Sequence, residues 1–96
     1  MKIQIQYFGS VRAAAKKFDE EVEFAPNRTL YSLLQQLACE HEKEFQGEIF
    51  DTSGKEIRDD ITISVNGTII KHENAGEIIL KSGDILALFP IFPGGG

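Results

Sequence analysis

Thr29-Leu30-Tyr31-Ser32-Leu33-Leu34-Gln35-Gln36-Leu37 carries the clearest structural pattern in this chain. Its leucines recur at positions i, i+3, i+4 and i+7, the spacing that places apolar side chains on one face of an α-helix. Thr29 is one of the residue types that cap helix N-termini. We therefore predict one main helix that begins after Thr29, runs to about Lys43 or Glu44, and packs its leucine stripe against a sheet.

Segments that alternate between apolar and polar residues stand on both sides of this helix, as expected of strands with one buried face. Residues 2–8 alternate cleanly, and residues 21–24 alternate again within hairpin distance. Beyond the helix, residues 61–65 and residues 68–71 are separated by a short turn. Residues 85–89 form a last strand that is apolar at every position.

The connections between these segments differ in how well their sequences define them. Asn66-Gly67 is typical of a two-residue type I′ hairpin turn. Residues 13–17 are consistent with either a short helical turn or a loop. Residues 45–60 are the least defined part of the chain, with a turn signal at Gly47 and others after it. The short extended pieces expected there are Ile49-Phe50 and Ile57.

The order strand, strand, helix, strand, strand, strand predicts an α+β protein with the β-grasp (ubiquitin-like) arrangement. We expect a mixed sheet of four to five strands with one main helix packed across one face. A right-handed crossover makes the first and last strands parallel neighbours in the middle of the sheet. Because the last strand is apolar on both faces, one of its faces is uncovered unless a partner binds there. Residues 1–90 form this domain, and residues 91–96 form a flexible C-terminal tail.

Composition excludes several classes of protein. A chain of 96 residues makes one domain, and its net charge of −5 argues against nucleic-acid binding, which needs a basic surface. Cys39, the single cysteine, excludes a disulfide framework and a four-cysteine iron–sulfur cluster. His41 is expected to be structural at the helix end, and His72 has no metal-binding neighbours, so we expect no metal site. We expect no membrane span and no signal peptide, and hence a cytoplasmic protein.

The C-terminal residues Phe92-Pro93-Gly94-Gly95-Gly96 have no evident packing role. Three glycines bury no apolar side chain and have the largest backbone entropy to lose on ordering. They form a thin thread that ends in a carboxylate and fits a narrow channel in another protein. The alternative is a frayed terminus, since chain ends tolerate disorder.

Motifs along the whole chain together resemble those of the MoaD/ThiS family. Phe8-Gly9-Ser10-Val11-Arg12 follows the first strand, and Val65-Asn66-Gly67 forms the hairpin. Lys81-Ser82-Gly83-Asp84 precedes the last strand, and Phe89-Pro90 leads to the terminal glycines. The members of this family are ubiquitin-like sulfur carriers, and the small subunit of molybdopterin synthase is the best known. The resemblance implies the β-grasp fold.

The resemblance also implies a reaction cycle at the terminal residue. A ubiquitin-activating-type enzyme uses ATP to adenylate the carboxylate of Gly96, and a sulfur donor displaces AMP to leave a thiocarboxylate. Gly95 takes part in this reactive end, and the tail thread is Gly94, Pro93 and Phe92. The sulfur passes to a substrate held by a second partner, the large subunit of molybdopterin synthase or another sulfur-acceptor enzyme. The chain binds no cofactor itself and is not a catalyst on its own. It departs from the family in its extra glycine, Gly96, and in the stiffening residue Pro93.

A docking surface is predicted on the open face of the sheet. Phe8, Ile69 and Phe89 each fall out of phase with the buried positions of their strands, and an exposed apolar patch marks an interaction site. By resemblance, these positions contact both partner enzymes, and Arg12 pins the loop after the first strand. The alternatives are scattered surface apolar residues, which are common, and a plain solvated arginine.

Other functions use the same features. A ubiquitin-like modifier would conjugate its terminal glycine to lysines of other proteins. A sulfur carrier could also serve thiazole formation, tRNA thiolation or cysteine synthesis. A binding-only β-grasp domain would use the sheet face and not need the glycines.

Overall fold

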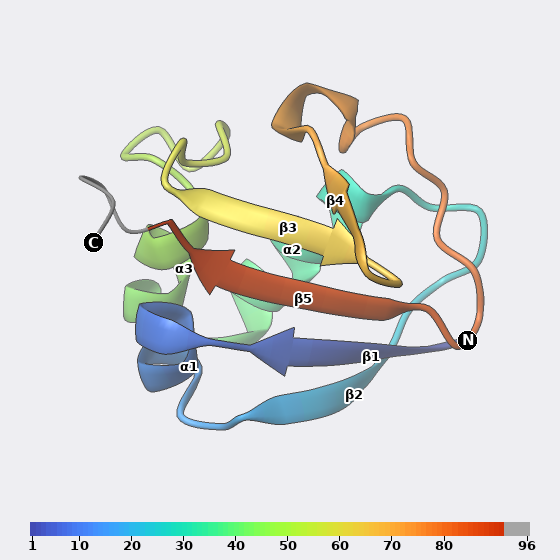
Figure 1. Ribbon diagram of the computed structural model, residues 1–96, viewed down its shortest axis with the longest axis horizontal. Coiled ribbons are helices and arrows are strands. Elements are labelled where there is room, and N and C mark those ends of the chain that lie inside the picture. The colour runs from blue at the N-terminus through green and yellow to red at the C-terminus, as the bar shows by residue number, and fades with distance from the viewer. Residues whose placement is uncertain (92–96) are drawn as a thin grey trace.

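The computed structural model describes residues 1–91 and contains one five-stranded mixed sheet in the order β2-β1-β5-β3-β4 (Figure 1). Strand β1 pairs in parallel with β5, and the other neighbouring strands are antiparallel. The predicted central placement of the first and last strands is therefore confirmed. The strands are β1 (Lys2–Tyr7), β2 (Asp19–Glu23), β3 (Ile61–Val65), β4 (Thr68–Ile70) and β5 (Ile85–Pro90).

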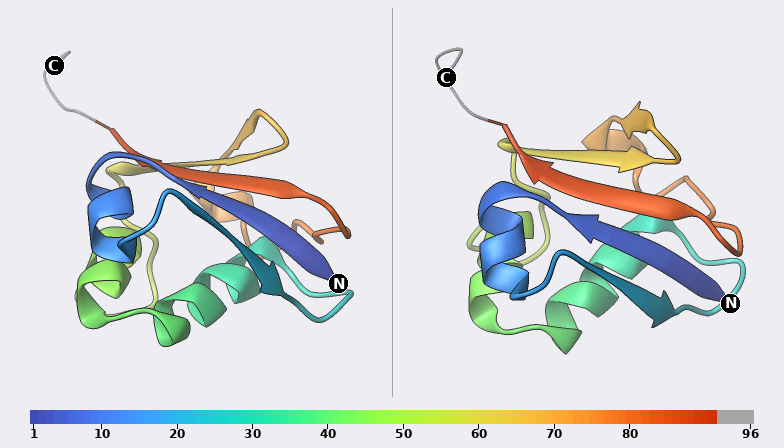
Figure 2. Two further views of the ribbon diagram at one scale, coloured as in Figure 1. Left: turned by 90° about the horizontal axis from the view of Figure 1, so that it is seen from below. Right: turned by 60° about the horizontal axis from the view of Figure 1, so that its bottom comes forward.

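The helices all lie against one face of this sheet, and the other face carries no helix (Figure 2). The fold is an α+β β-grasp, as the sequence predicts, with two more helices than the single main helix expected. Within residues 1–91, no helix is long and apolar enough to cross a membrane. The helices are α1 (Gly9–Ala15), α2 (Leu30–Glu40) and α3 (Lys43–Ile49), and a 3₁₀ turn, η1, covers His72–Asn74.

Helix α2 forms where the leucine pattern predicts it. The Thr29 hydroxyl accepts a hydrogen bond from the backbone N–H of Ser32 at 3.2 Å and so caps the first turn. The four leucines of the stripe are fully buried and form the centre of the core with the inward side chains of β1, β3 and β5. They are Leu30, Leu33, Leu34 and Leu37.

The predicted end of this helix at Lys43 or Glu44 is wrong. Helix α2 ends at Glu40, because His41 has extended backbone angles (φ −106°, ψ 172°). The His41 side chain is held by the carboxylate of Glu20 on β2, with Nε2 and Oε2 2.6 Å apart. The chain therefore breaks at His41, and α3 begins at Lys43 as a separate helix.

The segment that the sequence defines least contains an unpredicted helix. Ile49 was expected to be extended and Gly47 to mark a turn, but both belong to α3. Phe45 and Ile49, four residues apart, are fully buried on the inner side of α3. Phe50, in contrast, pairs with Ile57 in an antiparallel bridge, as the extended pieces predict.

The turn at Asn66-Gly67 forms as predicted, and the segment after β1 is more helical than predicted. Asn66 and Gly67 both have positive φ angles, 52° and 84°, as a type I′ turn requires. The segment after β1 is the helix α1, which begins at Gly9, earlier than the short turn considered from residue 13. It buries Val11 and Ala15 against the core.

Candidate functional site

The open face of the sheet carries an aromatic pair at the end where β1 and β5 finish. The ring of Phe8, which is 39% exposed, meets the ring of Phe89 edge to face, with centroids 6.1 Å apart and planes at 88°. Phe8 also donates its backbone N–H to the carbonyl of Leu88 at 3.1 Å, which extends the β1–β5 ladder. We call Phe8 and Phe89 the aromatic patch. It borders a surface pocket of about 540 Å³.

Strand alternation explains why this patch is not in the core. Leu86 and Leu88 point to the helices and are fully buried. Ile85 and Phe89 therefore point to the open face, where Ile85 is 41% exposed and Phe89 is half-buried. The apolar residues that the sequence places on both faces of β5 are thus divided between the core and an uncovered surface.

Ile69 lies on the same face but apart from the aromatic patch. It is 67% exposed and pairs with Ser64, which in turn pairs with Ala87. Phe89 pairs instead with Thr62 on β3. The structure therefore brings Phe8 and Phe89 together and places Ile69 two strands away from β5.

Arg12 is part of this surface and is not a freely solvated arginine. It lies on α1, and its Nε donates a hydrogen bond to the carbonyl of Tyr7 at 2.9 Å. Its guanidinium stands 5.2 Å from the ring centre of Phe8 and 4.3 Å from that of Phe18. Arg12 thus links the aromatic patch to Phe18, a residue that is 68% exposed.

Phe18 is a surface residue that the sequence reasoning missed. It stands between Lys17 and Asp19, in a polar segment, where a single aromatic has no periodic partner. The only available signal was its large apolar side chain among charges. Phe18 contacts Arg12 only in the folded chain, where α1 lies beside the start of β2.

The predicted reactive end, Gly95 and Gly96, and the predicted tail thread, Phe92, Pro93 and Gly94, lie outside the described residues. The structure does describe the base of the tail. Strand β5 ends at Pro90, and Ile91 donates its backbone N–H to the carbonyl of Asp60 at 2.8 Å. This end of β5 lies beside α1 and α3, at the opposite end of the molecule from the N-terminus (Figure 1).

A second group of polar residues lies on the helix side of the sheet. The hydroxyl of Tyr7 donates to Oε2 of Glu20 at 2.5 Å, and His41 Nε2 is 2.6 Å from the same oxygen. Burial raises the pKa of Glu20, but hydrogen bonds from Tyr7 and His41 and the charges of His41 and Lys17 outweigh burial, so the net pKa is lowered. Burial and the neighbouring carboxylate raise the pKa of Tyr7. These groups join β1, β2 and the end of α2, the structural role predicted for His41.

Metal ligation and cysteine chemistry have no evident basis in the part of the chain that the structure describes. No group of three or more His, Cys, Asp or Glu side chains within residues 1–91 is arranged to hold a metal ion. Cys39 is exposed on α2.

Comparisons with known proteins agree with the fold. A model of the ThiS family matches residues 5–95. No curated protein sequence matches the chain significantly. The crystal structure of SAMP1 from Haloferax volcanii is similar, with 25% identity, a TM-score of 0.84, and coverage of 99% of this chain and 100% of that one.

Two further solved structures extend the comparison. A putative molybdopterin converting factor, subunit 1, from Pyrococcus furiosus has 27% identity and a TM-score of 0.72, and the match covers 96% of this chain and 99% of that one. The solution structure of Urm1 from Trypanosoma brucei has 23% identity and a TM-score of 0.77, with coverage of 98% and 95%. At that identity, the Urm1 likeness supports the fold alone.

Proposed function

The chain belongs to the ThiS family of ubiquitin-like sulfur carriers and modifiers, and from this premise we propose that it is a sulfur carrier activated at its C-terminal glycine, Gly96. In the first step, a carboxylate oxygen of Gly96 attacks the α-phosphorus of ATP on a partner enzyme, and pyrophosphate leaves. In the second step, a donor of sulfur at the hydrosulfide level attacks the acyl carbon, and AMP leaves. The product is a thiocarboxylate, whose sulfur passes to an acceptor.

The observation that carries this proposal is the position of the tail base beside the aromatic patch. Phe89 belongs to the strand that ends at Pro90, and Phe8 packs against it, so a partner that binds this pair also holds the start of the tail. Residues 91–96, when extended, reach up to about 20 Å. The reactive end therefore lies within about 20 Å of the base of the tail. A single partner enzyme is large enough to contact both the docking surface and the reactive end.

The proposed reaction requires no general acid or base from the carrier itself. A carboxylate is a poor electrophile at neutral pH, and the acyl-adenylate supplies the leaving group that it lacks. The partner holds ATP and the groups that move protons. The titratable cluster around Glu20 lies on the helix side of the sheet, away from the patch, which fits a structural role.

Within this function, we assign the chain to molybdopterin or tungstopterin synthesis, as the small subunit that brings sulfur to a larger acceptor subunit. The similarity to the Pyrococcus furiosus protein supports this assignment. Thiazole formation, tRNA thiolation and cysteine synthesis are the other pathways in which such a carrier would serve. Capture of a large synthase subunit with the wild-type chain, but not with a Phe8→Arg variant, supports the pterin pathway, and its consistent absence removes that pathway.

The experiment that tests the carrier function is the accurate mass of the C-terminal peptide from protein purified from its own cells without a C-terminal tag. Replacement of one carboxylate oxygen by sulfur confirms the function and shows whether the reactive residue is Gly95 or Gly96. The peptide must be separated from Met1, because methionine oxidation adds a similar mass. A bare carboxylate after incubation with the adenylating enzyme, ATP and a sulfur donor contradicts the carrier function.

A protein modifier is the second candidate. SAMP1, a small archaeal modifier protein, superposes over the whole length of both chains, which favours this alternative. Conjugates of higher mass that contain this chain, and that disappear when Gly95 and Gly96 are deleted, would support it. A binding-only domain predicts instead that the deletion changes no function.

A further inference from the structure

The base of the C-terminal tail is held by a contact outside the aromatic patch. Ile91 donates its backbone N–H to the carbonyl of Asp60 at 2.8 Å. Asp60 immediately precedes β3, and the next residue, Ile61, pairs with Pro90. The bond therefore adds one rung to the β3–β5 ladder, and the place of Ile91 depends on the place of Asp60.

Arg58 fixes Asp60 in turn. Its Nε and Nη2 donate to the two carboxylate oxygens of Asp60 at 2.9 and 2.5 Å, the two-pronged geometry that sets orientation as well as distance. Its Nη1 donates to the carbonyl of Gly47 in α3 at 2.6 Å, and its backbone N–H donates to Ile49 at 2.8 Å. The side chain and backbone of Arg58 thus tie Asp60 to the last turns of α3.

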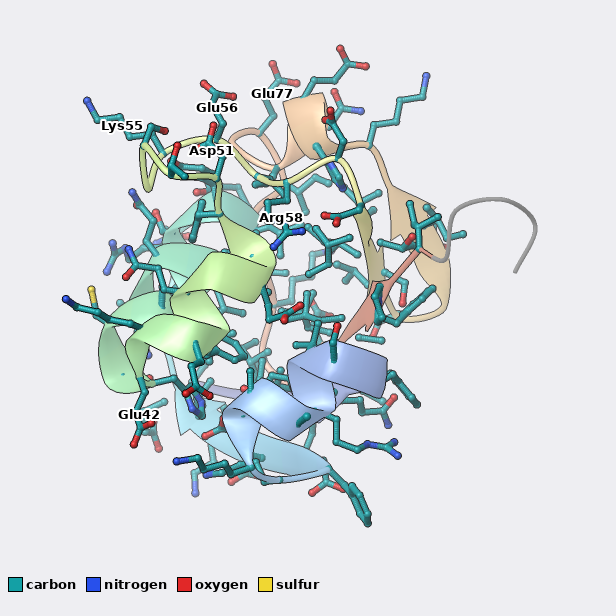
Figure 3. All side chains as sticks on the ribbon, turned by 90° about the vertical axis from the view of Figure 1, so that its left-hand side faces the viewer. Glu42, Asp51, Lys55, Glu56, Arg58 and Glu77 are labelled. Carbon is teal, nitrogen blue, oxygen red and sulfur yellow. The ribbon has the colours of Figure 1, made fainter. Side chains whose placement is uncertain are left out.

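The orientation of Arg58 differs from that of its charged neighbours. Figure 3 shows Arg58 between α3 and β3, whereas Lys55 and Glu56 point away from the folded body. Arg58 and Asp60 also line, together with Pro90 and Ile91, a cavity of about 260 Å³. Arg58 therefore lies at the base of the tail and, although partly exposed, does not project into solvent as Lys55 and Glu56 do.

The contribution of the Arg58–Asp60 ion pair to the free energy of unfolding does not explain why these side chains are arranged in this way. The Arg58 and Asp60 side chains are 38% and 53% exposed. Exposed ion pairs contribute little to the free energy of unfolding, because solvent screens them. What the pair supplies is a fixed geometry where the tail begins.

We propose that Arg58 is a positioning residue for the adenylation of the tail: by holding Asp60, it sets the place and direction from which residues 92–96 continue. This inference rests on the proposed function and deepens it. Because Ile91 is already held by Asp60, fewer backbone angles remain to be ordered when the partner takes up the tail. Loss of this constraint lowers the fraction of bound chains whose terminus is placed for reaction, and small misplacements of a reacting group cost large factors in rate. In this proposal, the aromatic patch binds the partner enzyme, and Arg58 holds the start of the tail in place through Asp60.

The first test is amide hydrogen exchange by NMR on the full chain. Arg58→Ala should raise the exchange rate of the Ile91 amide roughly three- to fivefold, the effect expected from loss of an ion pair of this strength. The Ile91 exchange rate in Arg58→Lys should lie between those of wild type and Arg58→Ala, because lysine keeps the charge but cannot donate two parallel hydrogen bonds to the Asp60 carboxylate. The midpoint of urea unfolding should change little in either variant.

The matched control is Lys2→Ala. It removes another exposed ion pair, Lys2 with Glu21 at 3.1 Å, whose side chains are 63% and 45% exposed, at the start of β1 and so at the opposite end of the molecule. This variant should leave the Ile91 exchange rate unchanged. An unchanged rate in Arg58→Ala as well would overturn the inference.

The second test is the kinetics of adenylation by the partner enzyme, followed by ATP–pyrophosphate exchange. Arg58→Ala should lower kcat by at most roughly three- to fivefold, the same factor as in the exchange rate, and leave KM unchanged, because the docking patch is intact. A faster-exchanging Ile91 amide with unchanged kcat would refute the positioning role. If the wild-type chain is not adenylated at all, the proposed function fails, while the exchange data still decide whether Arg58 fixes the tail base.

Discussion

Phe8 and Phe89 come from the two ends of the sequence, yet their rings meet edge to face on the open side of the sheet, 6.1 Å apart. The contact exists because β1 and β5 are parallel neighbours and finish at the same end. Residues that pack in this way on an uncovered surface add little to the core. They form a small rigid surface directly beside the point where the tail begins.

Removal of either ring should weaken partner binding far more than it weakens the fold. Phe8→Ala and Phe89→Ala should each lower affinity for the adenylating enzyme by about tenfold or more, as expected of buried aromatic contacts in an interface. Titration calorimetry measures the affinity, and urea unfolding should show a small loss of stability. Ile79→Ala, which trims an apolar side chain 48% exposed and off β1 and β5, is the control and should bind normally. Equal effects of all three variants would argue against a localised docking surface.

Arg12 should contribute to both stability and docking. Arg12→Ala removes a hydrogen bond to the Tyr7 carbonyl and contacts with two aromatic rings. We expect a loss of about 1–2 kcal/mol in the free energy of unfolding. Arg28→Ala is the comparison, since Arg28 stands 5.7 Å from the ring of Phe24 and should cost less. Chemical denaturation distinguishes them, and equal losses would contradict the role assigned to Arg12.

Acid should destabilise the protein through Glu20. The folded-state pKa of this carboxyl lies below its ordinary value of 4.5. Its contribution to stability is therefore complete above that value and is lost as the pH falls through the folded pKa. Glu20→Gln should cost about 1–2 kcal/mol at pH 7 and should lose less stability than wild type between pH 7 and pH 3.

Urea unfolding at a series of pH values measures this difference. Glu56→Gln is the control, because the Glu56 side chain points into solvent (Figure 3). Its pH dependence should follow that of the wild type. Parallel pH profiles for wild type and Glu20→Gln would show that the Glu20 contacts contribute no linked stability.

A glycine inside α3 leaves room for a stabilising substitution. A Cβ atom at Gly47 would meet no atom within 4 Å, and the residue does not have a positive φ angle. Gly47→Ala should therefore raise the free energy of unfolding by about 0.5–1 kcal/mol, because alanine loses less backbone entropy in a helix. Gly67→Ala also meets no atom but has a φ angle of 84°, so it should destabilise. Thermal unfolding compares them, and a shared sign would refute the argument.

The parts of the fold with long, regular patterns were predictable from the sequence. Four leucines and the cap at Thr29 specify α2, and Asn66-Gly67 specifies its turn, because each pattern has one local solution. The parallel contact of β1 and β5 followed from strand order and handedness. The open face followed from the alternation of β5, in which Phe89 is out of phase with Leu88.

The missed features depend on contacts between segments far apart in sequence. Helix α2 stops at Glu40 because His41 binds Glu20 on β2, which no local pattern reveals. Helix α3 is short and contains Gly47, so its intrinsic helix propensity is weak. The burial of Phe45 and Ile49 in the core stabilises it instead. The bond from Ile91 to Asp60 required the register of β3 on β5, which the sequence does not specify.

The place of β5 in the sheet also has a mechanical consequence. Since β5 lies between β1 and β3 and precedes the tail directly, a pull on the tail acts along its length against both neighbours. Tension between the two chain ends loads the parallel β1–β5 hydrogen bonds in shear, so that they must fail together and cannot be peeled apart one by one. Under the proposed function, a pull on the tail against the N-terminus would therefore meet this resistance before the domain unravels.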